Sequence, residues 1–321
     1  MARPYLYITR KLPDEIVDEF RNAFDVHMWP HEEIPVDEET LQHHIQKANA
    51  LLTMLTDKVD ENSLRVANHL KVIANLAVGY DNIDLKSARD KRIIVTNTPD
   101  VLTETTADLT FGLLLSTARR IIEANQFIKS GEWKQWSPFL MAGSEVHHKT
   151  VGIVGMGRIG SAFARRAKGF GMEILYHNRS RNVEAEQELQ ATYATFDDLL
   201  EQSDFVVCLA PYAANTKGMF GKRAFQKMKT SAIFINASRG LNVDETALYH
   251  ALINKDIKAA GLDVFENEPI NKEHPLLSLN QVVCLPHIGS ATVETRERMI
   301  HLCFENIDLV LKGDRPKTPV S

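Results

Sequence analysis

The sequence predicts an α/β protein built from two doubly wound domains, each with a parallel sheet between layers of helices. Its 321 residues are more than a single hydrophobic core commonly holds. Hydrophobic residues make up 44% of the chain and charged residues 25%, which is typical of a globular protein. Short apolar runs alternate with amphipathic segments almost from the start, as parallel strands joined by crossover helices require.

The first hundred residues contain five apolar runs of strand length. Segments with a helical spacing of apolar residues lie between them, such as 14–23, where Ile16, Val17 and Phe20 would share one face, and 38–48. The strands predicted from these runs are 5–9, 25–29, 50–55, 72–76 and 93–97.

A long helix is predicted from Thr103, whose hydroxyl suits a helix cap, through the run LTFGLLLSTARR. A second alternating set follows, and a last helical pattern covers 293–311. Because no long linker separates the two sets, we expect one domain over 1–100, completed by 290–321, and another over 101–289. The six strands of the second set are 150–154, 173–177, 205–210, 232–237, 259–264 and 282–285, and its helices are 159–168, 196–201, 222–228 and 244–254.

Charge and composition exclude several classes of protein. The formal net charge of −5 disfavours binding to nucleic acid and to anionic membranes. The most apolar stretch, 109–118, is far shorter than the ~20 residues of a membrane span. Cys208, Cys284 and Cys303 stand far apart in apolar surroundings, which indicates reduced, buried thiols rather than disulfides or a metal site. With no signal-peptide pattern, we expect a cytoplasmic protein.

A glycine-rich turn joins an apolar strand to an amphipathic helix. Gly155, Gly157 and Gly160 have the spacing G-x-G-x-x-G. Gly155 would permit the tight turn, Gly157 the close approach of a pyrophosphate, and Gly160 the packing of helix on strand. The first helical N–H groups, including those of Arg158 and Ile159, would face the phosphates. In this context the pattern favours a dinucleotide site over a purely structural turn.

The end of the next strand indicates which dinucleotide binds. An NAD site usually places an acidic residue there to hold the ribose 2′-hydroxyl. This chain has Asn178, Arg179, Ser180 and Arg181 instead, with no acidic residue before Glu184. The arginines and the serine could bind a 2′-phosphate, or both arginines could simply face solvent. The sequence therefore predicts NADPH, with NADH as the weaker cofactor.

Three later strands each lead into an unusual polar residue: Arg239, then Asp263 and Glu268, then His287. Arginine can bind a carboxylate through two parallel hydrogen bonds. Histidine can protonate an oxygen while a hydride reaches the neighbouring carbon. A carboxylate beside the histidine would favour its protonated form. Any one of these residues could be structural, but at the ends of strands beside a dinucleotide site they predict metal-independent carbonyl reduction.

The chain resembles the D-2-hydroxyacid dehydrogenase family, and most of all its glyoxylate/hydroxypyruvate reductases. The matching stretches are NLAVGYDNID, TPDVLTETTAD, TVGIVGMGRIG, INASRG, GLDVFENEP and LPHIGSAT, with GEWKQWSP and NRSR typical of the reductase branch. The resemblance implies a flavodoxin-like substrate domain and a Rossmann dinucleotide-binding domain.

The resemblance also implies roles for individual residues. Arg239 would anchor substrate, Glu268 would orient His287, and His287 would be the acid and base. Leu55, Val78 and Gly79 would contact substrate, and Trp136 would reach the active site of a partner in a homodimer joined by the coenzyme domains. The remaining implied cofactor contacts are Thr106, Pro211, Ala237, Asp263 and Gly289.

The activity expected from these features is reduction of glyoxylate to glycolate and of hydroxypyruvate to D-glycerate with NADPH. Another 2-oxo acid reductase, such as a 2-ketogluconate reductase or a phosphoglycerate dehydrogenase, is the nearest alternative. A dinucleotide-sensing protein similar to the corepressors of the family is a further one, because a sensor can retain the same residues.

Overall fold

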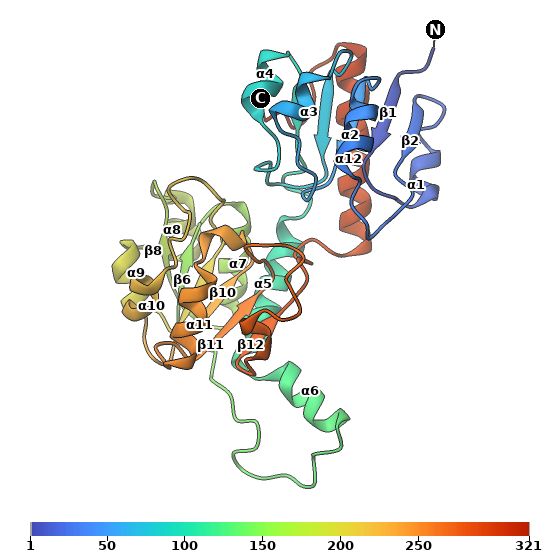
Figure 1. Ribbon diagram of the computed structural model, residues 1–321. Coiled ribbons are helices and arrows are strands. Elements are labelled where there is room, and N and C mark those ends of the chain that lie inside the picture. The colour runs from blue at the N-terminus through green and yellow to red at the C-terminus, as the bar shows by residue number, and fades with distance from the viewer. Residues whose placement is uncertain (1, 321) are drawn as a thin grey trace. The chain divides into compact units, whose positions relative to one another are not determined.

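The computed structural model describes residues 2–320, which divide into two compact units (Figure 1). The first unit contains the residues up to Leu102 together with those from Thr292 onward. The second unit runs from Thr103 to Ala291. Each unit is an α/β structure around one parallel sheet, so the predicted fold class is confirmed.

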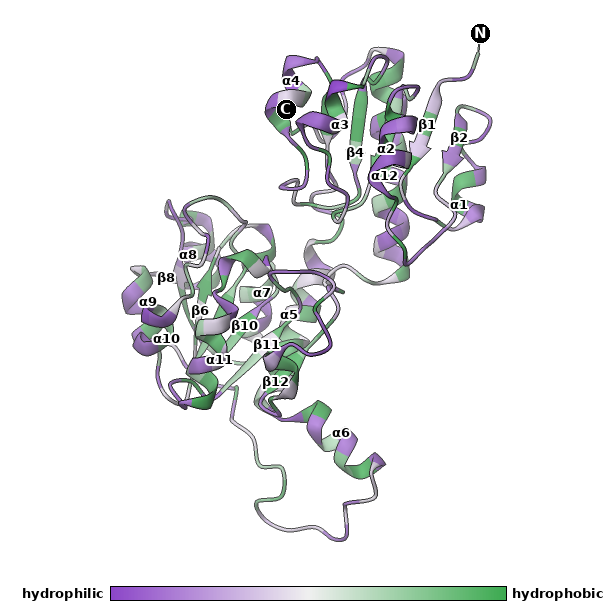
Figure 2. Cartoon of the chain, viewed as in Figure 1, coloured by the Kyte–Doolittle hydropathy of each residue, from purple (hydrophilic) through white to green (hydrophobic). Residues whose placement is uncertain are grey.

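The first unit has a five-stranded sheet in the order β2-β1-β3-β4-β5, the flavodoxin-like order that the resemblance implies. All its strand pairs are parallel. The interior strands β3 and β4 are buried along their full length, and Figure 2 shows hydrophobic residues along β4. The strands are β1 (Tyr5–Ile8), β2 (Asp25–Met28), β3 (Ala50–Thr53), β4 (Val72–Asn75) and β5 (Ile94–Thr96).

Aspartates begin three of the short helices of this unit. Asp37 accepts the Thr40 N–H, Asp60 the Ser63 N–H, and Asp84 the N–H groups of Lys86 and Ser87, so each side chain satisfies donors that a helix start leaves open. The helices are α1 (Asp14–Asp18), α2 (Glu38–Ile45), α3 (Glu61–Arg65), α4 (Leu85–Asp90) and α12 (Val293–Lys312).

The second unit has a seven-stranded sheet in the order β12-β11-β10-β9-β6-β7-β8. In chain order, β7 and β8 are added on one side of β6, and β9 to β12 are then added on its other side, as in a Rossmann sheet. Six strands were expected, and β8 is the additional one, only two residues long. The strands are β6 (Thr150–Val154), β7 (Glu173–His177), β8 (Thr192–Tyr193), β9 (Phe205–Cys208), β10 (Ile233–Asn236), β11 (Ala259–Leu262) and β12 (Val282–Cys284).

Helix α5 packs on α7 and on β10, β11 and β12 of this unit.

None of the helices among residues 2–320 is long and apolar enough to cross a membrane. The helices of the unit are α5 (Thr103–Ala118), α6 (Ile121–Lys129), α7 (Arg158–Gly169), α8 (Val183–Leu189), α9 (Phe196–Gln202), α10 (Lys222–Lys227) and α11 (Glu245–Ile253), with short 3-10 helices at Gly240–Asn242 and Pro275–Ser278.

Several predicted boundaries were wrong. The helix expected over 14–23 ends at Asp18, and tighter turns with hydrogen bonds from Phe20 to Val17 and from Ala23 to Phe20 continue it. Thr103 is the first residue of α5 rather than its cap, and α5 ends at Ala118 because Arg120 adopts a left-handed conformation. No bounds were predicted for α3 and α4, and α6 and α8 were not among the predicted helices. Cys284 is only half-buried, whereas Cys208 and Cys303 are buried as expected.

Asn306 ties the C-terminal segment to the first unit. Its side chain lies fully buried on α12, which packs on β3, β4 and β5. The amide donates to the Leu302 carbonyl at 2.9 Å and to the Thr318 hydroxyl at 2.8 Å, and its oxygen accepts the N–H groups of Lys317 and Thr318. Four hydrogen bonds thus converge on one buried amide.

We expect Asn306→Ala to lower the free energy of unfolding by about 2–3 kcal/mol, because it leaves buried donors and acceptors without partners. Urea unfolding of both proteins measures this loss. The matched control is Asp308→Ala on the same helix, which removes only a partly exposed pair with Lys312 and should cost less than about 0.5 kcal/mol. Equal effects of the two changes would contradict a special role for Asn306.

Candidate active site

Three neighbouring strands of the second unit carry the polar residues singled out from the sequence. The strands β10, β11 and β12 are adjacent and parallel, so their carboxyl ends meet at one edge of the sheet. Arg239 follows β10, Asp263 and Glu268 follow β11, and His287 follows β12. Ligands of open α/β sheets bind outside this edge.

Glu268 and His287 form a hydrogen-bonded pair. Nδ1 of His287 lies 2.6 Å from Oε2 of Glu268, and the two side chains are 24% and 23% exposed. The other carboxylate oxygen, Oε1, accepts the N–H of Phe265 at 2.9 Å. Both oxygens of Glu268 therefore have fixed partners, and Nδ1 of His287 is committed to the carboxylate. This leaves Nε2 as the ring nitrogen that can exchange a proton with a ligand.

Asp263 holds the turn that carries the histidine. Its side chain is 1% exposed, and Oδ1 accepts the N–H of Ile288 at 2.8 Å. Burial raises the pKa of the Asp263 carboxyl, whereas the hydrogen bond from Ile288 acts in the opposite direction. His287 has φ of 54°, a left-handed conformation that a non-glycine residue adopts only when its surroundings hold it there. Asp263 is one of the groups that do so.

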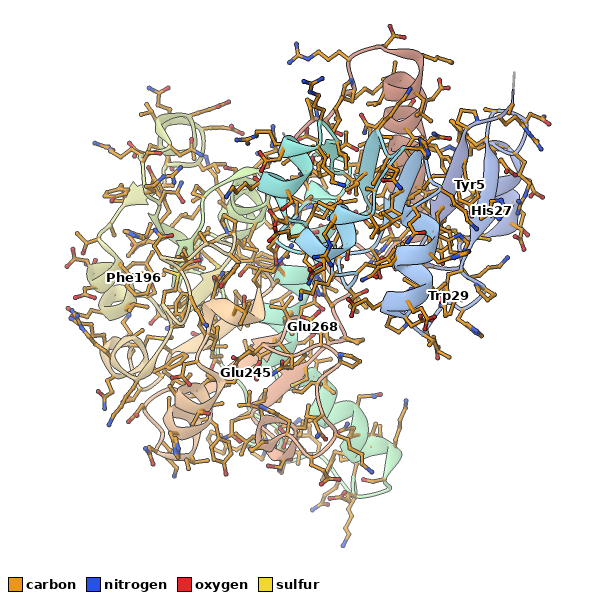
Figure 3. All side chains as sticks on the ribbon, turned by 45° about the horizontal axis from the view of Figure 1, so that its top comes forward. Tyr5, His27, Trp29, Phe196, Glu245 and Glu268 are labelled. Atoms are coloured by element: carbon orange, nitrogen blue, oxygen red, sulfur yellow. The ribbon has the colours of Figure 1, made fainter. Side chains whose placement is uncertain are left out.

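Glu245, at the start of α11, supports the loop that carries Glu268, and Figure 3 labels both residues. Its Oε1 accepts the N–H of Glu266 at 2.7 Å, and its Oε2 lies 3.2 Å from Nε2 of His274. Burial raises the pKa of the Glu245 carboxyl. The loop after β11 is therefore fixed at Glu266 and His274, on both sides of Glu268.

The loop also lies directly against the end of β10. A Cβ added to Gly240 would stand 1.8 Å from the carbonyl carbon of Phe265, so only glycine permits this approach. The preceding residue, Arg239, is half-buried and donates from Nη1 to the Ser238 carbonyl at 2.9 Å. Gly240 thus sets the spacing between the arginine and the loop that carries Glu268.

The glycine turn after β6 has the geometry of a phosphate-binding turn. Gly155 has φ of 106°, and a Cβ there would lie 2.4 Å from the N atom of Ala210. A Cβ on Gly160 would lie 2.2 Å from the Gly155 carbonyl oxygen. At Gly157, where α7 begins without a side-chain cap, an added Cβ would meet nothing within 4 Å. The open space in front of the first N–H groups of α7, at Arg158 and Ile159, fits a pyrophosphate.

Two asparagines in the segment between β7 and α8 hold this turn. Oδ1 of Asn178 accepts the N–H of Met156 at 2.7 Å, and its Nδ2 donates to the Met156 carbonyl at 3.2 Å. Asn182 donates to the same carbonyl at 2.9 Å. The side chain of Asn178 is thus engaged with the glycine turn, which its position at the end of β7 did not reveal.

The two arginines after β7 have different surroundings. Arg179 and Ser180 are exposed, and Arg179 has no side-chain partner among residues 2–320. Arg181 instead forms a two-pronged ion pair with Glu186, at 2.9 Å from Nε to Oε1 and 2.5 Å from Nη2 to Oε2. The structure therefore separates two side chains that the sequence pattern treats alike.

The other expected cofactor contacts all lie in the second unit. Thr106, Asp263 and Gly289 lie together, since a Cβ on Gly289 would stand 3.2 Å from Oδ2 of Asp263 and 3.3 Å from Cγ2 of Thr106. Pro211 and Ala237 follow the adjacent strands β9 and β10.

The expected substrate contacts Leu55, Val78 and Gly79 lie in the first unit, after the carboxyl ends of β3 and β4. Asn97 donates to the Val78 carbonyl at 2.7 Å, and Asn75 donates to the Gly79 carbonyl at 2.8 Å. These bonds fix the orientation of the loop that would offer backbone N–H groups to a carboxylate.

Sequence reasoning missed the residues that support the site. Asn75 lies inside a motif that was recognised, yet only its neighbours Val78 and Gly79 were given a role. Asn182 stands three residues before the N–H that it caps, a spacing that could have identified it as a helix cap. Glu245 and Glu186 carried no such signal, because their partners come from other turns of the chain.

Comparison with known proteins places the chain among hydride-transferring enzymes. The family described as "D-isomer specific 2-hydroxyacid dehydrogenase, NAD binding domain" matches residues 111–289. Glyoxylate reductase of Thermococcus gammatolerans is 48% identical over 323 residues, covering 99% of this chain and 96% of that protein. The glyoxylate reductase of Aeropyrum pernix is 44% identical, covering 100% and 97%. The NADPH-dependent glyoxylate/hydroxypyruvate reductase of Sinorhizobium meliloti, solved with NADP and malonate, superposes with a TM-score of 0.86 at 33% identity, covering 100% of this chain and 97% of that one.

We expect Gly240→Ala to destabilise the second unit by about 2–4 kcal/mol, because the new methyl group must displace the backbone at Phe265. Thermal and urea unfolding measure this loss. Gly169→Ala on α7 is the matched control, since a Cβ there meets nothing within 4 Å, and it should be neutral or slightly stabilising. Unchanged stability in the Gly240 variant would mean that the loop yields without cost.

Proposed function

Because the chain belongs to the D-isomer specific 2-hydroxyacid dehydrogenases and is an NAD(P)-dependent oxidoreductase, we propose that it reduces small 2-oxo acids, glyoxylate to glycolate and hydroxypyruvate to D-glycerate, with NADPH preferred. The observation that carries the proposal is the 2.6 Å contact between His287 and Glu268, which follow strands of the same parallel sheet that leads into the glycine turn. The relatives named glyoxylate reductase support the choice of substrate.

His287 acts in this proposal as the acid. Nδ1 is held by Glu268, so Nε2 gives its proton to the keto oxygen of the substrate. A reduced nicotinamide, when bound, supplies the hydride that the keto carbon accepts. The carbon–oxygen double bond becomes a single bond, and the product is a 2-hydroxy acid. The hydrogen bond to Glu268 holds the imidazole ring in one orientation during the transfer.

Arg239 binds the substrate carboxylate in the proposal, because its planar guanidinium can donate two parallel hydrogen bonds to one carboxylate. In the first unit, we assign the backbone N–H groups of Val78 and Gly79 to binding of a carboxylate as well. Leu55 is assigned as an apolar contact. Asp263, Thr106 and Gly289 are assigned to the nicotinamide side, and Pro211 and Ala237 to the remainder of the cofactor.

The preference for NADPH rests on charge at the end of β7. A carboxylate at the Asn178 position would repel a 2′-phosphate, and this chain has none there. Arg179 is exposed beside the glycine turn and can donate charge-assisted hydrogen bonds to a phosphate, with Ser180 adding a hydroxyl.

A homodimer through the coenzyme units completes the proposal. The arm formed by α6 and residues 130–145 extends away from the body of its unit (Figure 1), and Figure 2 shows hydrophobic segments on α6. On this arm Trp136 is 75% exposed and Phe139 is 87% exposed. Apolar side chains gathered in this way are typical of protein–protein contacts. We assign Trp136 to the active site of the partner subunit.

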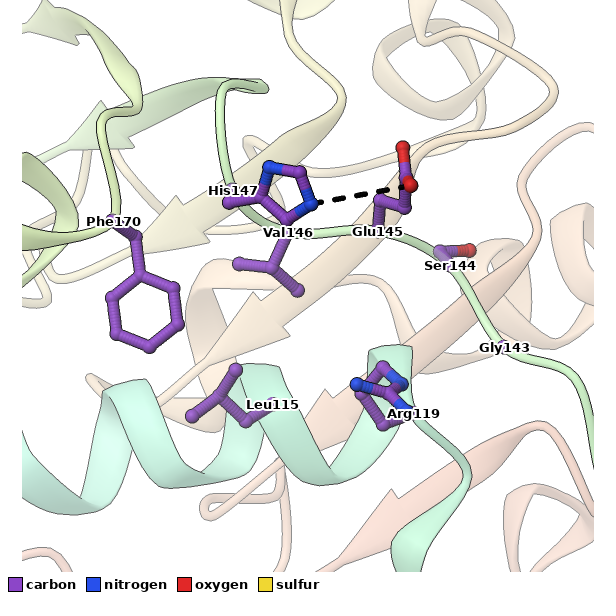
Figure 4. Close-up of a pocket in the computed structure, with 8 residues that line it drawn as sticks. All are labelled: Leu115, Arg119, Gly143, Ser144, Glu145, Val146, His147 and Phe170. Atoms are coloured by element: carbon purple, nitrogen blue, oxygen red, sulfur yellow. Dashed lines mark ion pairs between the residues drawn. The ribbon is translucent and has the colours of Figure 1, made fainter.

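A cavity of about 450 Å³ lies at the base of the arm (Figure 4) and supports the same assembly. Phe170, Leu115 and Val146 give it an apolar wall, and His147 pairs with Glu145 at 3.9 Å near its rim. A side chain of a second copy could fill this space. The complete lining is Leu115, Arg119, Gly143, Ser144, Glu145, Val146, His147 and Phe170.

His287→Asn should lower kcat for glyoxylate reduction by about 100-fold or more, because a positioned acid is lost. Asparagine tolerates the left-handed backbone at this position, so the turn should persist. Stopped-flow and steady-state assays with NADPH, NADH and a panel of 2-oxo acids measure the effect, and cofactor binding should stay within about threefold of the parent. A parent protein that binds NADPH but turns over none of the 2-oxo acids would instead favour the sensor alternative.

Arg179→Ala should lower kcat/KM for NADPH by about tenfold while leaving that for NADH nearly unchanged, because one charge-assisted hydrogen bond to the phosphate is lost. Parallel kinetics with both cofactors provide the comparison, and the NADH values serve as the internal control. Equal losses with the two cofactors would show that Arg179 does not read the 2′-phosphate.

Trp136→Ala should weaken dimerisation by about tenfold or more and also lower kcat/KM for glyoxylate, because the side chain serves both the interface and the partner's site. Sedimentation equilibrium and kinetics at several protein concentrations measure both effects. Val293→Ala is the matched control, since Val293 is 72% exposed but lies on α12 of the first unit. A fully active monomer of the parent protein would contradict the assembly.

A further inference from the structure

The ion pair between Arg181 and Glu186 lies where the proposed function needs positive charge. Glu186 stands on α8, the helix that follows the arginine-containing turn after β7. Its two oxygens accept hydrogen bonds from Nε and Nη2 of Arg181, at 2.9 Å and 2.5 Å. These two donors form one of the paired faces with which a guanidinium binds a phosphate.

Glu186 is held more firmly than its partner. The hydroxyl of Tyr176, a residue that is fully buried in β7, donates to Oε1 of Glu186 at 2.5 Å. The same hydroxyl accepts the N–H of Asn182 at 2.8 Å, which ties it to the cap of α8. The side chain of Glu186 is 16% exposed and that of Arg181 is 65% exposed. Because Arg181 is the more exposed of the two, it is the partner that can turn toward solvent while Glu186 keeps its bond to Tyr176.

The charge of Glu186 is secured by the same contacts. The hydrogen bonds from Arg181 and Tyr176 hold the pKa of this carboxyl below its usual range, so it is ionised at neutral pH. A second effect follows from that charge. A 2′-phosphate that approaches Arg181 meets the negative charge of Glu186 at the same place, whereas the 2′-hydroxyl of NADH carries no charge to repel.

We propose that Glu186 is a specificity-determining residue that competes with the 2′-phosphate of NADPH for Arg181 and thereby limits the preference for NADPH over NADH. The inference rests on the proposed function, because it concerns how the same cofactor site chooses between the two nicotinamides. Arg179, exposed and outside this pair, supplies the phosphate contact that Glu186 does not restrain.

The test compares Glu186→Gln with Glu184→Gln. Glutamine at 186 still offers Oε1 to the Tyr176 hydroxyl but removes the charge that holds Arg181. Glu184 lies on the same helix and is exposed, and it makes no contact with Arg181. Glu184→Gln therefore removes the same charge without disturbing the ion pair. Isothermal titration calorimetry with adenosine 2′,5′-bisphosphate and with 5′-AMP separates the phosphate contact from the rest of the cofactor.

We expect Glu186→Gln to tighten binding of the bisphosphate by about three- to tenfold and to leave 5′-AMP within about twofold of the parent. The kcat/KM ratio of NADPH to NADH should rise by the same factor. Glu184→Gln should change the bisphosphate affinity by less than about twofold. An equal gain in the two variants, or none in Glu186→Gln, would overturn the proposal.

A double-mutant cycle tests whether the gain passes through Arg181. Arg181→Ala alone should have little effect, because the parent's Arg181 is already engaged, but added to Glu186→Gln it should remove the gain. A gain that persists in the double variant would show that Glu186 acts only through its general charge, and would overturn the competition for Arg181.

Tyr176→Phe provides an independent route that keeps the carboxylate. Losing the hydroxyl frees Glu186 to move, so bisphosphate affinity should rise in the same direction as in Glu186→Gln but by a smaller factor; no rise in a folded Tyr176→Phe protein would contradict the anchored carboxylate. Equal use of NADPH and NADH by the parent would refute the proposed NADPH preference alone. Glu186→Gln would still be expected to create one, so failures of the two proposals are distinguishable.

Discussion

The hydrogen bond between Nδ1 of His287 and Oε2 of Glu268 is the contact on which the candidate site depends, because it fixes which ring nitrogen is available for proton transfer. Neither residue is positioned by its own strand alone. Asp263 holds the turn beside His287 through the Ile288 N–H, and Glu245 holds the loop beside Glu268 through the Glu266 N–H. The buried carboxylate of Asp263 and the half-buried carboxylate of Glu245 thus restrain the backbone beside each member of the pair, which lets a loop residue with a left-handed conformation keep a defined orientation.

The cofactor side of the unit is built by the same means. The glycines create space and permit the turn, but Asn178 and Asn182 determine where the backbone of Met156 lies. Because the Asn178 amide bonds both the N–H and the carbonyl of Met156, it restrains two successive peptide groups, which a single contact would not do. The phosphate-binding turn therefore depends on two strand ends, because its glycines follow β6 and the asparagines that restrain it follow β7.

The two arginines after β7 do not contribute equal positive charge at the edge of this turn. Arg179 faces solvent, whereas the guanidinium of Arg181 donates to Glu186. The buried Tyr176 holds that carboxylate through its hydroxyl. A count of positive residues in the segment would treat the two arginines as equal. Their different surroundings leave Arg179 exposed to solvent, whereas Arg181 would have to leave Glu186 before it could bind an anion.

The sequence by itself determined the fold class, the glycine turn, and the three strand ends that carry Arg239, Glu268 and His287, because alternation of apolar runs and the spacing of glycines are local properties of the chain. It could not locate β8, which has only two residues, or the early end of α1, because tertiary packing decides whether so short a segment pairs or turns. It also could not assign partners. The side chain of Asn178 turned out to hold Met156 and Arg181 to bind Glu186, contacts between separate turns of the chain that no local pattern records. Tertiary structure decided these roles, since hydrogen bonds and ion pairs depend on atoms that only folding brings within reach.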